Sequence, residues 1–183
     1  MSDELVFYTH PMSRGRVVRW MLEEVGHPYR TELLDFTSTM KAPEYRAINP
    51  MGKVPAIVHG GRIVTECAAI CAYLADAFPK AGLAPPPAER ADYYRWLFFA
   101  AGPIEAAFSN KAAGFIPDAD KQRMFGYGNF DLTIDALETA VAGKRHIAYD
   151  RFTAYIEPLK AREAWQRAIA IDDAVLHEPA TAQ

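Results

Sequence analysis

The N-terminal residues alternate between short apolar runs and a stretch of helical periodicity. Leu5–Tyr8 is an apolar run that ends in a proline-containing turn, and it predicts a strand. Between residues 13 and 25, apolar side chains recur every three or four positions, which predicts a helix that Gly26 ends. Residues 28–34 predict a second strand, so a helical crossover should connect the two strands.

The next segment adds a hairpin and a second strong helix. Residues 43–48 predict a short helix, and residues 55–58 predict a third strand. Gly60-Gly61 is a hairpin turn, so residues 62–64 should pair antiparallel with the strand before it. Residues 66–78 predict the second helix. This order of elements favours a small mixed sheet covered by helices.

A proline-rich segment then divides the chain. Residues 80–87 hold three consecutive prolines and are typical of a stiff linker. Only helical periodicity follows the linker, and it predicts three helices: residues 88–110, residues 121–141 and a helix within residues 159–171. The sequence therefore predicts an α/β domain over residues 1–79 and an all-α domain over residues 88–183.

Composition and charge exclude several classes of function. The 183 residues carry a formal net charge of −3 with no long run of one sign, which gives no electrostatic reason to expect a nucleic-acid partner. The acidic N-terminus leads directly into a strand, unlike a secretory signal, and the longest apolar run, near Trp96, is too short to span a bilayer. We therefore expect no membrane association.

Cysteine and histidine usage indicates a cytoplasmic protein without a metal site. Cys67 and Cys71 lie four residues apart on one predicted helix, so a disulfide framework is not expected and both thiols should be reduced. The five histidines are scattered, and none stands at ligand spacing from a cysteine.

The most informative motif is the turn Asn49–Pro55, followed by Thr65-Glu66 at the start of a helix. A proline at the first position of a strand cannot donate to the ladder, so it belongs at an edge or a special turn. Edge strands can pair with an extended peptide, and helix N-termini can hold a carboxylate. Together these features predict a binding site for a small acidic peptide.

These residues resemble the glutathione S-transferase superfamily. The resemblance covers essentially the whole chain, and it is most specific in Asn49-Pro-x-Gly-Lys-Val-Pro55, in Glu66-Cys67-x-Ala-Ile70 and in Tyr73-Leu74. It implies an α/β thioredoxin-like N-terminal domain and an all-α C-terminal helical domain. It also implies glutathione as co-substrate, no metal, and a homodimer.

The resemblance implies a role for each residue of the motif. Val54 would pair its backbone with the cysteinyl unit of glutathione, and Pro55 would be a cis-proline. Glu66, with the helix N-terminus, would receive the γ-glutamyl end, although Glu66 could also simply begin a helix. Lys53 is a candidate for the glycyl carboxylate, with Lys41 a weaker one. Cys67 stands where the family usually has serine, and since a thiol is the weaker hydrogen-bond donor, glutathione affinity could be reduced.

Ser13 is the candidate that would hold the glutathione sulfur as a thiolate. It follows the turn after the first strand and immediately precedes the first helix, a position similar to the serine- and cysteine-type classes of the family. From the sequence alone, Ser13 could equally be a helix N-cap. Tyr8, near the end of the first strand, is the alternative catalytic residue, and its other interpretation is a core strand residue.

The second domain departs from the family pattern. After Phe152-Thr153 the family usually has Ala-x-Asp and a long buried helix, whereas this chain continues directly to Glu157-Pro158. About one helix is therefore missing near residues 154–155, either by deletion or because residues are absent from the sequence.

Three functions remain open. The first is a cytoplasmic detoxification enzyme, a glutathione S-transferase that conjugates the glutathione thiolate to a small hydrophobic electrophile. The second is a glutathione-dependent reductase of disulfides or peroxides, which would use the same thiolate. The third is a non-catalytic transferase-like binding protein, which the change at Cys67 and the missing helix would favour.

Overall fold

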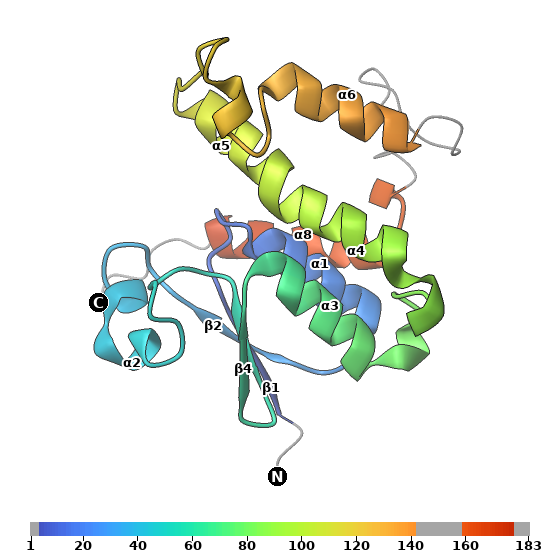
Figure 1. Ribbon diagram of the computed structural model, residues 1–183. Coiled ribbons are helices and arrows are strands. Elements are labelled where there is room, and N and C mark those ends of the chain that lie inside the picture. The colour runs from blue at the N-terminus through green and yellow to red at the C-terminus, as the bar shows by residue number, and fades with distance from the viewer. Residues whose placement is uncertain (1–3, 142–158, 178–183) are drawn as a thin grey trace. The chain divides into compact units, whose positions relative to one another are not determined.

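The computed structural model of the chain describes residues 4–141 and 159–177 (Figure 1). Its contacts form two compact units: Met1–Ala84 with Arg162–Gln183, which we call the sheet unit, and Pro85–Ala161, which we call the helical unit. The predicted loss of a helix near residues 154 and 155 lies outside the described residues. The domain boundaries at residues 79 and 88 stay a prediction.

The four predicted strands form one mixed sheet in the order β2-β1-β3-β4. The strands are β1 (Leu5–Thr9), β2 (Arg30–Leu33), β3 (Ala56–His59) and β4 (Arg62–Thr65). β1 pairs parallel with β2 through the crossover helix α1 (Gly15–Val25) and antiparallel with β3. Gly60 and Gly61 both have positive φ, 55° and 80°, as a two-residue hairpin between twisted strands requires. The predicted mixed sheet is confirmed.

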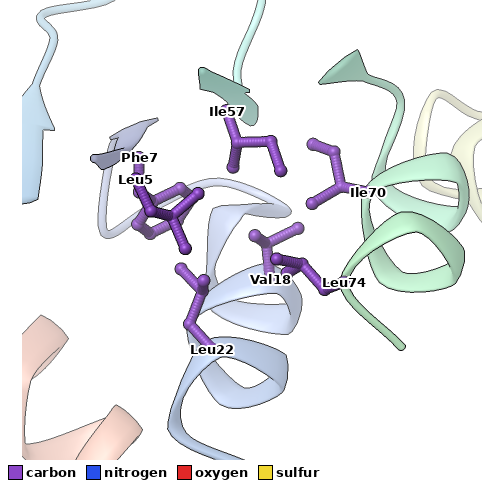
Figure 2. Packing of buried hydrophobic residues seen from close by; sticks show 7 residues of the cluster. All are labelled: Leu5, Phe7, Val18, Leu22, Ile57, Ile70 and Leu74. Carbon is purple, nitrogen blue, oxygen red and sulfur yellow. The ribbon is translucent and has the colours of Figure 1, made fainter. Parts of the chain in front are cut away.

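Successive side chains of β1 and β3 point to opposite faces of the sheet, and each face packs against a different set of residues. Phe7 and Ile57 point to the face that α1 and α3 (Cys67–Ala77) cover. Figure 2 shows them, with Leu5 of β1, among side chains of both helices: Val18, Leu22, Ile70 and Leu74. Their strand neighbours Tyr8, which follows Phe7, and Ala56, which precedes Ile57, pack on the other face with Met40 and Tyr45. Tyr45 belongs to the short helix α2 (Pro43–Arg46), which follows the 3-10 turn η1 (Thr39–Lys41).

Helix α1 ends where the sequence predicts, because Gly26 adopts the left-handed conformation (φ 69°) and its N–H bonds to the carbonyl of Leu22. Helix α3 is followed by the 3-10 turn η2 (Pro79–Ala81).

The last helix, α8 (Glu163–His177), packs against α1 within the sheet unit. The rings of Trp20 and Trp165 meet edge to face with centroids 4.7 Å apart. Beside them Arg19 donates from Nε to Asp172 Oδ1 at 2.7 Å, and both side chains are 1% exposed. A buried charge pair and an aromatic contact therefore fix α8 to the first crossover helix.

The helical unit contains the other predicted helices. After the turn η3 (Pro87–Glu89), α4 (Arg90–Phe99), the π-helical turn η4 (Ala100–Ile104) and α5 (Glu105–Ala112) follow one another without a break, close to the predicted 88–110. No helix in the described part of the chain has the length and apolar character needed to cross a bilayer.

The helix predicted over residues 121–141 is shorter than expected. The turn η5 (Gln122–Met124) comes first, and α6 begins only at Phe130 and runs to Val141. Gly128 has a φ of 66°, which a helix does not allow, and the Asn129 side chain then accepts the N–H of Leu132 at 2.8 Å. The glycine turn and this cap, rather than the apolar periodicity, set the start of α6.

Candidate functional site

Ser13 lies at the junction between β1 and α1. Its hydroxyl donates to the carbonyl of His10 at 2.6 Å and accepts the N–H of Gly15 at 3.0 Å. The second contact satisfies one of the N–H groups that a helix leaves unpaired at its N-terminus. Ser13 is half-buried, so one face of the residue remains reachable from solvent. The structure therefore places Ser13 one residue before the N-cap Arg14, where its hydroxyl pairs with the first N–H of α1 and can meet a ligand at this end of the helix.

Gly15 allows α1 to begin directly against the end of β1. A Cβ at this position would lie 1.9 Å from Thr9 Oγ1 and 2.9 Å from Ser13 Oγ. The Thr9 hydroxyl is fully buried and has no hydrogen-bond partner among the described residues. Any side chain larger than hydrogen would therefore force Thr9 or Ser13 to move, so only glycine allows this close packing beside Ser13. The sequence pattern does not predict this close packing of Gly15 against Thr9.

The turn Asn49–Pro55 is held by side chains that contact its backbone. Asn49 is buried, donates from Nδ2 to the carbonyl of Lys53 at 2.8 Å, and accepts the N–H of Met51 at 3.1 Å. The Tyr45 hydroxyl donates to the same Lys53 carbonyl at 2.6 Å. Lys41 donates from Nζ to the carbonyl of Gly52. The turn is thus fixed from the α2 side.

Lys53 and Val54 present different groups at this turn. The Lys53 side chain is exposed, while its carbonyl is held by the two bonds just described. The Val54–Pro55 peptide is cis, as the resemblance implies. Pairing of β3 begins only at Ala56, and among the described residues no backbone hydrogen bond uses the N–H or C=O of Val54. Both groups can therefore pair with an extended peptide.

Glu66 and Cys67 form the N-terminus of α3. Glu66 is the only residue other than glycine with positive φ (67°) among the described residues, a conformation that costs about 1–3 kcal/mol. Its side chain is exposed at the point where the helix N–H groups are unpaired. The Cys67 thiol lies 3.8 Å from the carbonyl of Arg14. This contact brings the N-termini of α3 and α1 side by side.

Tyr8 occupies a different environment from Ser13. Its ring lies 5.5 Å from the ring of Tyr45 and packs with Met40 and Ala56 on the face of the sheet that α2 covers. That packing fits the interpretation of Tyr8 as a core strand residue.

The charges around the junction are partly paired. Arg16, on the first turn of α1, forms an ion pair with Asp173 at 3.0 Å, so its contribution to the positive potential at Ser13 is reduced.

Within the described residues no group of three or more histidine, cysteine or acidic side chains could hold a metal ion.

A family comparison matches this junction and this turn together. Residues 12–77 match the family described as "Glutathione S-transferase, N-terminal domain". That span includes Ser13 and the whole segment from Lys53 to Cys67. The N-terminal part of the chain is therefore a glutathione S-transferase N-terminal domain.

Two solved structures are similar to nearly the whole chain. A glutathione transferase structure from Methylococcus capsulatus is 26% identical with a TM-score of 0.73, and the match covers 93% of this chain and 99% of that one. A transferase homologue from Sulfitobacter, solved with bound glutathione, is 23% identical with a TM-score of 0.68, and the match covers 95% and 99% of the two chains. The predicted thioredoxin-like domain followed by a helical part is confirmed.

The curated relatives match over a shorter span. Glutathione S-transferase GST-4.5 of Xanthomonas campestris is 34% identical over 94 residues, which are 50% of this chain and 44% of that protein. The matches to the first curated relatives cover less than half of their lengths, between 21% and 44%.

Proposed function

We propose that this protein is a glutathione transferase that adds the glutathione thiolate to a small hydrophobic electrophile. The observation that carries the proposal is the unpaired backbone of Val54 in the same unit as two helix N-termini that the Cys67–Arg14 contact brings together. An extended acidic peptide with a thiol suits such a site. The homologue from Sulfitobacter with bound glutathione supports that choice of ligand.

Each part of glutathione would meet a different element. The Val54 N–H and C=O would pair with the cysteinyl unit, as a strand edge does with a peptide. The γ-glutamyl carboxylate would lie at the N-terminus of α3, and the Glu66 carboxylate would meet its ammonium group. The exposed Lys53 side chain would reach the glycyl carboxylate. Cys67 would contribute its backbone N–H, since its thiol is a weak donor.

Ser13 would stabilise the sulfur as a thiolate. A thiol with a pKa of about 8.5 is only ~3% ionised at pH 7, and lowering that pKa to about 6.5 raises the fraction to ~75%. The shift requires about 2.7 kcal/mol of differential stabilisation. One hydroxyl bond to an anion supplies about 1.5–3 kcal/mol, and the N-terminus of α1 adds to it. The Ser13 hydroxyl would turn from the His10 carbonyl to the sulfur.

A non-catalytic binding protein is the second candidate, because the Ser13 hydroxyl already has a backbone acceptor. A reductase of disulfides or peroxides is a third, since it would use the same thiolate. We further propose a cytoplasmic homodimer with a role in detoxification, on the strength of the family resemblance.

One experiment separates these functions. The protein and its Ser13→Ala variant are tested for retention on immobilised glutathione, for turnover of a chlorinated nitroaromatic and for reduction of a small disulfide. Ser109→Ala, an exposed serine in the helical unit, is the matched control. We expect retention of all three proteins, with nitroaromatic turnover at least about tenfold slower in Ser13→Ala alone. Retention without turnover by the wild type would favour a binding protein. Disulfide reduction that is faster than nitroaromatic turnover would favour a reductase.

A further inference from the structure

Helix α3 carries both cysteines of the chain on one face. Cys67 is its first residue and Cys71 lies four residues later, so the side chains are neighbours on the helix surface. Neither is in a disulfide, and both are half-buried. The Cys71 thiol hydrogen-bonds to Cys67. The two thiols therefore lie next to each other, at the end of the helix where the glutathione carboxylate would bind.

We propose that Cys67 and Cys71 form a reversible disulfide that weakens glutathione binding when a hydroperoxide oxidises the pair. The effect on glutathione rests on the proposed function, whereas the formation of the disulfide does not.

The oxidation balances with a hydroperoxide as the oxidant. The Cys67 sulfur attacks the peroxide, the O–O bond breaks, and the products are the Cys67 sulfenic acid and water or an alcohol. The Cys71 sulfur then attacks the sulfenic sulfur, water leaves, and the S–S bond forms. Two electrons pass from the thiols to the peroxide. Two glutathione molecules reverse the step and leave as one oxidised glutathione.

The order of attack follows from the contact between the thiols. The hydrogen bond to Cys67, together with burial, raises the pKa of the Cys71 thiol. A raised pKa disfavours the Cys71 thiolate, so we assign Cys67 as the attacking sulfur and Cys71 as the resolving one. Cys67 also lies at the helix N-terminus, where an anion is favoured.

The geometry of the helix explains why such a disulfide would affect binding and remain easy to reduce. Residues four apart have Cα atoms about 6.2 Å apart in an ideal helix, within the range for disulfides. Their Cβ atoms are about 5–6 Å apart, however, and a disulfide requires about 3.5–4.5 Å. The first turn of α3 must therefore tighten, which moves the Cys67 N–H and the adjacent Glu66. Strained disulfides are the labile ones.

The disulfide is tested by mass and thiol counting after treatment with hydrogen peroxide. We expect the wild type to lose two titratable thiols and the mass of two hydrogen atoms, and dithiothreitol to restore both. Cys71→Ser, which keeps the shape of the side chain, should instead gain oxygen at Cys67 or, with oxidised glutathione, one glutathionyl group. Retained thiols, or oxygen or glutathionyl adducts on the wild type, would overturn the proposal.

Its effect on the site is tested by calorimetry with glutathione. The oxidised wild type should bind roughly tenfold more weakly than the reduced wild type, and the peroxide-treated Cys71→Ser variant should not show the disulfide-specific, dithiothreitol-reversible loss. Unchanged affinity of a protein with a proven disulfide would overturn the regulatory part. No binding by the reduced wild type would instead reject the proposed function, while the thiol count would still decide the disulfide.

Discussion

The sheet unit and the helical unit differ in how completely they bury their side chains. In the sheet unit, seven apolar side chains from β1, β3, α1 and α3 are at most 1% exposed. In the described part of the helical unit, α4 has no buried residue, and Phe98 and Leu132 are 68% and 57% exposed. Every candidate binding residue lies in the sheet unit. Functional groups that need fixed geometry thus belong to the region whose packing can hold them.

The largest effect should come from removing the buried charge that joins α8 to α1. Asp172→Ala leaves the Arg19 guanidinium buried without its carboxylate, which should lower the free energy of unfolding by about 3–5 kcal/mol. Urea denaturation measures this. Asp173→Ala is the matched control, because it removes the exposed partner of Arg16 and should cost less than about 1 kcal/mol. Equal losses in the two variants would mean that α8 is not anchored by the buried pair.

Two glycines test the difference between the units directly. Gly15→Ala places a methyl group against Thr9 and should cost about 1–3 kcal/mol of stability, with loss of glutathione binding as Ser13 is displaced. Gly102→Ala, in the helical unit, meets open space and should be neutral or stabilising by up to about 1 kcal/mol. Thermal unfolding of both variants compares them. A tolerated Gly15→Ala would contradict the tight junction between β1 and α1.

Two substitutions of Glu66 separate its effect on the stability of the sheet unit from its effect on glutathione binding. Glu66→Gly relieves the positive φ and should raise stability by about 1 kcal/mol, while glutathione affinity falls roughly tenfold with the loss of the carboxylate. Glu66→Gln keeps the strain and should show only the weaker binding. Denaturation and calorimetry on both variants give the two quantities. Binding unchanged in both would remove Glu66 from the site.

The smallest effect is expected at Cys67. Cys67→Ser replaces the weak thiol donor with a hydroxyl and should keep or tighten glutathione binding, without measurable change in stability. Calorimetry on the reduced proteins provides the comparison, and a clear loss of affinity would contradict this role.

Local patterns predicted the sheet, while contacts between distant residues were missed. The strands, the Gly60-Gly61 hairpin and the Gly26 stop depend on neighbouring residues, and the turn before Pro55 has a recognisable spacing. The pairing of Arg19 with Asp172 joins residues 153 positions apart, so periodicity gives no signal for it. The start of α6 was missed because apolar spacing outweighed the glycine at position 128.

The same division holds within the candidate site. Ser13, Val54 and Glu66 stand at element boundaries that a sequence reveals. The bonds from Asn49 and Tyr45 to the Lys53 carbonyl, and the contact of Gly15 with Thr9, depend on how those elements pack.

The central claim is that the sheet unit holds the glutathione sulfur ionised beside Ser13. Titration of the ultraviolet thiolate absorbance of bound glutathione tests it most directly, with wild type, Ser13→Ala and Tyr8→Phe compared. The account predicts a thiol pKa of about 6.5 in the wild type and in Tyr8→Phe, and a value about 1–2 units higher in Ser13→Ala. Identical titration curves for wild type and Ser13→Ala would contradict it, and a shift in Tyr8→Phe alone would assign the role to Tyr8.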